Sequence, residues 1–289
     1  MLILKRLSAG SIWEGATWMR KLLRIYLPFT RAGILEMVTY RVNFMFFLLG
    51  EIMKCFVMFF VWKAVFDSSQ SATLYGFTYD NMVAYLFITF LCGYLTYSDG
   101  AYVIGKEVLD GSIAMRMIKP VDFDMCFLFQ ELGGKLMQAI MIFIPITAGV
   151  EIYRFVTNGR FMLNVWMLLV FLASMIIAYL INFYFNLSYG FLAFYLKNLW
   201  GTDIIKAVIV GFLSGATVPL AFLGGFGKVL SYLPFASLSY TPVMIYMGLY
   251  SIKEMVFYIG LQLLWLCLFI VISRLILASA TKRLVVHGG

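Results

Sequence analysis

Long apolar runs alternate with short polar segments along most of the 289-residue chain. An α-helix needs about 20 mostly apolar residues to cross the hydrocarbon core of a bilayer. Six runs approach or exceed this length, at residues 42–66, 81–104, 133–150, 163–185, 204–223 and 255–277. The pattern therefore predicts an all-α membrane protein with six transmembrane helices.

The two ends of the chain lie outside these spans. Residues 1–41 are basic, and between Trp18 and Val38 their apolar residues recur at helical spacing. Basic residues set between apolar ones are typical of a helix that lies in the plane of the membrane interface. We expect Pro28 to kink or break this helix, and we assign residues 278–289 to a terminal tail.

The stretch between the fifth and sixth spans stays apolar but contains residues that oppose a continuous helix. They are Gly224, Gly225, Gly227, Pro234 and Pro242. Glycine and proline are the residues that destabilise a helix interior most. We therefore predict a re-entrant or interfacial segment here, which must pack against protein because its backbone polar groups need partners.

Lysine and arginine are unevenly distributed between the two sides of the predicted bundle. With the N-terminus inside, fifteen fall on the cytoplasmic side and five outside, while Lys54 and Lys135 stay unassigned. Because positive residues favour the cytoplasmic side, we predict that both termini are cytoplasmic. Asp67–Asp80 and Glu151–Arg160 are then outside loops, and the chain is a multi-pass protein of the cell membrane.

Composition supports a membrane protein and limits the chemistry. The chain is 63% hydrophobic and only 12% charged, whereas about a quarter of a soluble domain is charged. Its net charge of +8 comes from basic residues at span ends, which indicates lipid headgroups rather than nucleic acid. One histidine, His287, and four scattered cysteines without a CxxC motif give no metal or cofactor site.

Two charged residues lie inside the first predicted span. Glu51 and Lys54 are three residues apart, so they share one helix face and can pair. Charges within a membrane are costly and usually face a bundle interior or a wet cavity. The pair could line a substrate pathway, or it could fix the orientation of the helix.

The polar segment Gly105–Phe129 lies between the second and third spans and holds seven charged residues. Gly100–Glu107, which overlaps the start of this segment, resembles a phosphate-binding P-loop. Glu107 stands where that motif needs Ser or Thr, and a membrane span precedes it instead of a strand. We therefore expect no nucleotide site. Asp122 and Asp124 are expected to be solvated helix caps rather than a catalytic pair.

Short motifs in and before this segment resemble a known family. They are Tyr40–Phe44 (YRVNF), Asp110–Ile113 (DGSI) and Met117–Val121 (MIKPV). With the length and the six spans, they resemble the permease subunits of type-2 ATP-binding cassette (ABC) exporters, in the six-span subfamily linked to viologen, drug and antibiotic-peptide export. The chain departs from the family pattern at Ala114, where an acidic residue is usual.

This resemblance implies partners and a division of labour. Such permeases pair as homodimers or heterodimers, bind no ATP themselves, and recruit two separate ATPase subunits. The segment after the second span would dock on the ATPase as a coupling helix, limited at its end by Pro120. The candidate coupling residues are Glu107, Asp110, Gly111, Ser112, Ile113, Arg116, Lys119 and Pro120.

The expected cargo is apolar or amphipathic, such as a drug, a peptide or a lipid, because the predicted interior is aromatic and sparsely charged. Two other functions stay open at this point. An ion-coupled secondary transporter would use intramembrane acids, of which Glu51 is the candidate. An integral-membrane enzyme that modifies lipid would need a polar catalytic cluster, and the sequence contains no evident one.

Overall fold

A computed structural model describes residues 12–69, 71, 73–159, 164–196 and 199–280. This part of the chain is helical apart from one isolated β-bridge between Leu74 and Phe77, so the predicted all-α fold is confirmed there. The remaining residues lie outside the description. They include six residues used to predict the orientation, Lys5, Arg6, Arg160, Lys197, Lys282 and Arg283, as well as His287.

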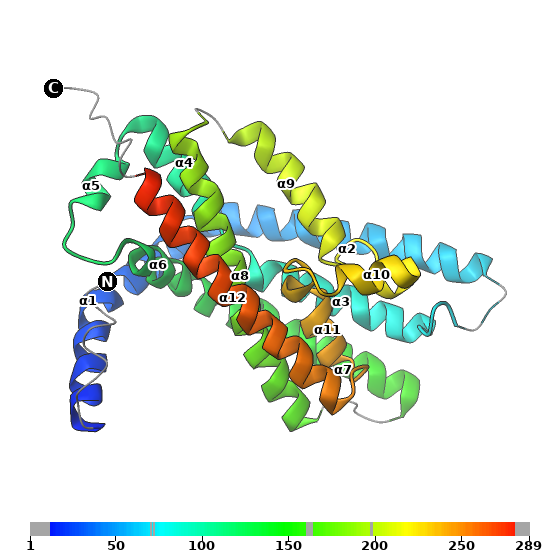
Figure 1. The fold of residues 1–289 in the computed structure, drawn as a ribbon. Helices are drawn as coiled ribbons and strands as arrows, with labels where there is room; N and C mark the ends of the chain where they lie inside the picture. Colours follow the sequence, from blue (N-terminus) through cyan, green and yellow to red (C-terminus); the bar gives the residue numbers. More distant parts are fainter. Residues whose placement is uncertain (1–11, 70, 72, 160–163, 197–198, 281–289) are drawn as a thin grey trace.

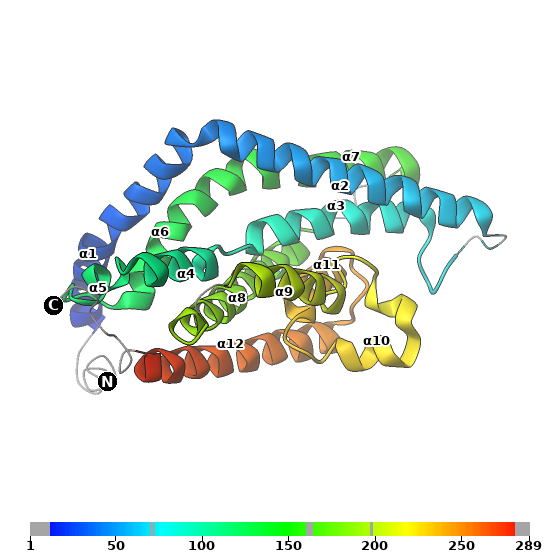
Figure 2. The same ribbon diagram turned by 90° about the horizontal axis from the view of Figure 1, so that it is seen from above.

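Five helical stretches are long and apolar enough to cross a membrane. They run side by side in the bundle seen in Figures 1 and 2. Three are interrupted or change helix type along their length. The five are α2 (Arg41–Ser68), α3 with α4 (Tyr79–Thr96 and Gly100–Asp110), α6 with η2 and α7 (Phe123–Gln138, Ala139–Phe143 and Ile144–Asn158), α8 with η3 (Val165–Gly190 and Phe191–Phe194), and α12 (Ile252–Ala280).

The predicted fifth span, residues 204–223, is divided between two helices. Helix α9 (Trp200–Leu213) ends before a turn, and the 3₁₀ helix η4 (Leu220–Leu223) follows it. The 14 residues of α9 are fewer than the about 20 that a crossing usually takes. The count of six crossings therefore stays a prediction.

Short helices then replace a continuous span, in the region where the glycines and prolines interrupt the sequence. They are α10 (Gly224–Leu230), η5 (Ala236–Leu238) and α11 (Tyr240–Tyr246). Every residue of α11 is buried. The segment therefore packs against protein at α11, as the prediction required. The turn before it is held as well, because the Tyr85 hydroxyl donates to the backbone carbonyl of Gly215 at 2.7 Å.

Residues 151–158 were predicted to be part of a loop, and this prediction is wrong. Helix α7 continues to Asn158. Glu151 and Arg154 are paired on one face of the helix at 3.4 Å, and the Tyr246 hydroxyl donates to Glu151 at 3.1 Å. These contacts allow α7 to bury two charged side chains. The polar residues of this segment therefore belong to a helix and not to a loop.

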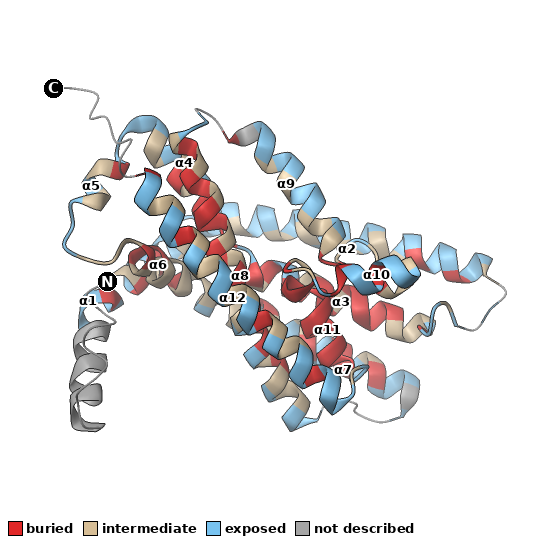
Figure 3. Ribbon diagram, viewed as in Figure 1, coloured by how far each residue is buried: buried red, intermediate tan, exposed pale blue. Residues whose placement is uncertain are grey.

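The buried residues form two hydrophobic clusters along the bundle (Figure 3). The larger centres on α3 and includes α11. The smaller joins α4, α6 and α8, and it contains Ile104, Phe127 and Phe183. Helix α2 lies beside α3 but is mostly exposed, because only 6% of its most apolar stretch is buried within the described protein.

Helix α1 (Ile12–Thr39) precedes α2 and changes direction into it near Tyr40 (Figure 2). It runs unbroken through Pro28, so the expected break at that residue is wrong. Pro28 is exposed, whereas Tyr26 and Thr30 on the opposite side are buried. Proline has no backbone N–H, so one hydrogen bond of the helix is missing at this residue. Packing of the opposite side on α6 keeps the helix continuous there.

Two glycines allow the backbones of α1 and α6 to touch. A Cβ on Gly33 would lie 1.9 Å from the carbonyl oxygen of Gln130, and a Cβ on Gly133 would lie 2.2 Å from that of Thr30. Small residues permit such close helix approach in membranes. At Gly134, which adjoins Gly133, a Cβ would meet nothing within 4 Å. The crossing thus needs Gly133 and not Gly134.

We predict opposite effects for two neighbouring substitutions. Gly133→Ala forces a methyl group into the α1 backbone and should lower the free energy of unfolding by about 1–3 kcal/mol. Gly134→Ala, the matched control, should be neutral or raise it slightly, because alanine favours helix over glycine. Thermal unfolding of the purified chain in detergent measures both, and equal midpoints for the two variants would contradict the proposed crossing.

Candidate functional site

The candidate site is the α4–α6 connection, residues 105–122, which includes α5 (Ile113–Met117). Helix α4 ends at Asp110, and Gly111 follows with a φ of +79°, which glycine adopts at little cost. The Asp110 carboxylate accepts hydrogen bonds from the Ser112 backbone N–H at 2.9 Å and hydroxyl at 2.6 Å. These contacts turn the chain sharply from α4 into α5.

Arg116 holds α5 against the helices on both sides. Its guanidinium donates two hydrogen bonds to the Glu107 carboxylate, of which the Nε–Oε2 contact is 2.9 Å. It also lies over the ring of Phe127 on α6, 4.1 Å from the ring centroid. Both charged side chains are less than one-fifth exposed. Arg116 and Glu107 therefore satisfy each other and brace the connection.

Ile113 anchors the connection from within, at 2% exposure in the smaller cluster. The outward side carries apolar residues that the sequence analysis did not single out. Leu109, Met115 and Ile118 are about 70% exposed, at 71%, 67% and 73%. The sequence shows these apolar residues within a charged segment, but only the fold shows that they are exposed, and it is their exposure that marks a contact surface.

The remaining predicted coupling residues lie on the same outward side or beside it. Asp110, Gly111, Ser112, Lys119 and Pro120 are all exposed. Lys119 follows Ile118 directly, and its backbone N–H bonds to the Arg116 carbonyl at 3.4 Å. The structure thus brings all eight predicted residues into one compact unit. It divides them into three that brace this unit, Glu107, Ile113 and Arg116, and five that remain available to a partner.

The start of α6 is tied to two other helices. Arg274 of α12 contacts Asp122 at 3.1 Å and Asp124 at 2.9 Å. The backbone N–H of Asp122 donates to the Tyr26 hydroxyl of α1 at 3.2 Å, and burial raises the pKa of that Tyr26 phenol. Asp122 caps the helix as expected, by accepting from the Met125 N–H at 3.2 Å.

Asp124 is not the solvated cap that we expected, because its side chain has 0% exposure. A buried carboxylate is stable only with a charged or hydrogen-bonding partner. Arg274 supplies that partner from a position far along the chain, where sequence spacing gives no sign of the contact.

We predict that Arg274→Gln lowers the free energy of unfolding by about 2 kcal/mol, between the values for exposed and fully buried ion pairs. The loss comes from leaving Asp124 buried without its cation. Adding Asp124→Asn to this variant should recover much of the loss, whereas Lys119→Gln, which removes an exposed charge, should change little. Chemical unfolding in detergent tests this, and a double variant no more stable than Arg274→Gln would contradict it.

The interruption between α3 and α4 is held by polar side chains of α6 and α8. Ser98 donates to Glu131 at 2.8 Å, and Tyr179 donates to the same carboxylate at 3.1 Å. Asn182 donates to the carbonyl of Thr96 at 2.7 Å, at the end of α3. The polar groups freed by the interruption thus find partners on two neighbouring helices, as they must within a membrane.

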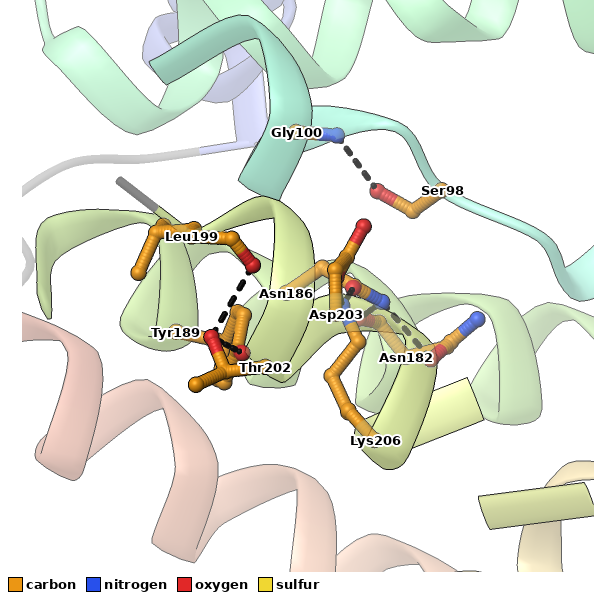
Figure 4. Close-up of polar contacts among 9 residues, drawn as sticks. All are labelled: Ser98, Gly100, Asn182, Asn186, Tyr189, Leu199, Thr202, Asp203 and Lys206. Atoms are coloured by element: carbon orange, nitrogen blue, oxygen red, sulfur yellow. Dashed lines mark hydrogen bonds and ion pairs between the residues drawn. The ribbon is translucent and has the colours of Figure 1, made fainter. Parts of the chain in front are cut away.

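A cavity of about 350 Å³ opens beside this interruption. It is lined by residues of α3, α4, α8 and α9 together with Ser214 and Ser239. Figure 4 shows the polar cluster on one wall, where Lys206 of α9 contacts Asn186 of α8 at 2.8 Å and Asp203 at 2.5 Å. Tyr97, Tyr102 and Phe185 add aromatic surface. The cavity can therefore contact both polar and apolar parts of a ligand.

The Glu51–Lys54 ion pair forms on α2, as the spacing predicted. It lies apart from the α4–α6 connection, with the Lys54 side chain 72% exposed and the Glu51 side chain 26% exposed. Lys54 therefore points away from the interior of the described bundle. Such a pair in the middle of a spanning helix needs water or another protein surface beside it.

Comparison with known proteins identifies one family. A family model described as "ABC-2 family transporter protein" matches residues 52–288. The matched region contains the α4–α6 connection, the cavity and all five stretches that can span a membrane, apart from the start of α2. No curated protein and no solved structure matches the chain.

Proposed function

The chain belongs to the ABC-2 transporter family, and on this premise we propose that it is the permease of an ATP-driven exporter whose ATPase subunits dock on the α4–α6 connection. The family is the membrane component of ABC transporters, so the chain is a transport permease, and we infer that ATP is hydrolysed on partner subunits. The observation that carries the docking proposal is the exposure of the apolar residues Leu109, Met115 and Ile118 on a braced unit, which the predicted orientation places in the cytoplasm.

This outward surface suits a protein partner. The three exposed apolar residues lie close in the sequence to the exposed polar residues Asp110, Ser112 and Lys119. Apolar and polar residues together suit a protein interface, which has an apolar core and a polar rim. The charges of Arg116 and Glu107 are satisfied internally, so they carry no desolvation cost on docking. We assign specificity to Lys119 and Asp110, and binding energy to the apolar group.

Bracing of the connection supports its role in transmitting movement. The Arg116–Glu107 pair joins α5 to α4, and the contact of Arg116 with Phe127 joins α5 to α6. The bonds of Asp122 join α6 to α1 and α12. A force on α5 would therefore move several helices as one body. Such rigid-body movement is a common form of switching between conformations.

We further propose that two permeases assemble around a shared pathway, as a homodimer or with a sister permease. Two observations support this arrangement. The Glu51–Lys54 pair lies on a spanning helix that is exposed along most of its length, and α9, which lines the cavity through other residues, carries exposed apolar residues such as Ile205 and Val208. A second subunit would cover both surfaces and close the cavity of each permease into a path.

The lining of that path favours an apolar or amphipathic cargo, such as a drug, a peptide or a lipid. Aromatic rings at Tyr97 and Phe185 suit its apolar part, and the amides of Asn182 and Asn186 suit a polar group. We further propose that the permease crosses the cell membrane six times, binds two ATPase subunits in its assembled form and moves its cargo outward. The family match favours ATP as the energy source over the ion-coupled and lipid-modifying alternatives.

We predict that Ile118→Asp and Lys119→Glu each reduce capture of the ATPase subunit several-fold, because they alter the centre and the rim of the docking surface. Co-purification with the tagged permease measures capture, and the ratio of ATP hydrolysis to transport in vesicles measures coupling. Lys63→Glu is the matched charge reversal at an exposed position at the other end of the bundle, and it should leave both values unchanged. Normal capture by both variants would rule out docking at this surface.

We also predict that Glu51→Gln, Lys54→Gln and the double variant each slow transport several-fold while the chain stays folded and still captures the ATPase. A pair that only orients α2 would behave differently, because removing both charges would relieve the unpaired charge that each single variant leaves. A double variant that transports at the normal rate, with slow single variants, would therefore assign the pair a structural role. Cargo uptake into inverted vesicles measures the rate.

A further inference from the structure

Helix α1 has two distinct faces. One packs on α6 and buries Tyr26, Thr30 and Gly33. The opposite face is exposed over the described side chains, and at helical spacing it carries Arg24, Leu27, Pro28, Arg31, Leu35 and Val38. The backbone contacts at Gly33 and Gly133 fix which face is outward, because rotation of α1 would bring bulkier residues into the crossing.

The outward face combines apolar side chains with unpaired positive charge. Leu27, Leu35 and Val38 are 43%, 65% and 45% exposed. Arg24 and Arg31 lie two helical turns apart on the same face, and within the described residues neither forms an ion pair. The nearby acid Glu36 is engaged by Gln130 of α6, whose amide donates to it at 3.1 Å.

We propose that this face of α1 is a binding surface for anionic phospholipids, with Arg24 and Arg31 contacting the phosphate-bearing headgroups and Leu27, Leu35 and Val38 contacting the acyl chains below them. Leu35 and Val38 are nearest to Tyr40, where the chain turns into the spanning helix α2. The apolar end of the face therefore lies next to the membrane. A helix with guanidinium groups beside exposed apolar side chains binds the interface of anionic membranes.

Charge and position favour a lipid over a protein partner. Guanidinium groups bind phosphate oxygens through paired hydrogen bonds, and each basic side chain near an anionic surface strengthens binding about fivefold. The exposed apolar group of the α4–α6 connection is a separate surface on α4 and α5. Lipid binding on α1 therefore does not compete with docking there, and it does not depend on the proposed ATPase contact.

The packing of α1 links bound lipid to the rest of the protein. Helix α1 makes its most extensive contacts with α6, the helix whose first turn holds Asp122 and Asp124. Headgroups on the outer face of α1 would thus stabilise the same rigid unit that carries the connection. Anionic lipid would then stabilise the position of this unit at the membrane surface.

The experiment measures which lipids the full-length chain retains. The chain is reconstituted in bilayers of equal phosphatidylcholine and phosphatidylglycerol, extracted in mild detergent, and its bound lipids are quantified by mass spectrometry. We expect phosphatidylglycerol to be enriched on the wild-type chain, and the enrichment to fall about fivefold in Arg24→Gln or Arg31→Gln and further in the double variant. High salt should lower the wild-type enrichment as well.

The matched control is Lys63→Gln with Lys253→Gln, which removes the same total charge from exposed residues at the other end of the bundle. It should keep the wild-type enrichment. Arg24→Lys with Arg31→Lys keeps the charge and should retain most of the enrichment, which separates charge from any effect on folding. Absence of enrichment on the wild-type chain, or equal loss in the control, would overturn the proposal. Loss of ATPase capture with enrichment intact would instead assign this face to the ATPase.

Discussion

A charged group in or beside a bilayer is stable only where another group or water compensates it, and this constraint explains much of the arrangement. Arg116 is satisfied by Glu107, Arg274 by Asp122 and Asp124, Arg154 by Glu151, and Lys206 by Asp203. Two of these pairings join different elements, Arg116 with Glu107 between α5 and α4 and Arg274 with Asp122 and Asp124 between α12 and the start of α6. Lys119 and Lys54 are among the charged residues that stay exposed, and such residues are suited to contact a partner or a pathway.

The α4–α6 connection illustrates how local and distant contacts combine. Gly111 and the Asp110–Ser112 bonds set the turn locally. Arg116 and Glu107, which are nine residues apart in the sequence, then join the two sides of this turn. The contacts of Asp122 with Arg274 and Tyr26, which are distant in the sequence, then hold the start of α6 against α12 and α1. A segment held in this way can present apolar side chains to water without collapsing onto them, which a flexible loop could not do.

Sequence reasoning found what depends on local pattern. Apolar runs located the five helical stretches that can cross a membrane, and a charged insert with Gly111 and Pro120 located the connection. It missed what depends on contacts between distant elements. Asp124 resembles a surface residue until Arg274 is placed beside it, residues 151–158 resemble a loop until Tyr246 reaches Glu151, and Pro28 predicts a break until α6 supports the other side of the helix. The exposure of Met115 and Ile118 also follows from the fold, because an apolar residue in a short helix is equally compatible with burial.

The central claim is that the outward side of α5 contacts the ATPase. The most direct test places a photo-reactive amino acid at Met115, which is 67% exposed, and illuminates the assembled transporter in membranes. The account predicts a covalent adduct between the permease and the ATPase subunit at this position, and none when the same group replaces Tyr75, which is 68% exposed at the other end of the bundle. An adduct at Tyr75, or none at Met115 in a complex that hydrolyses ATP and transports, would contradict it.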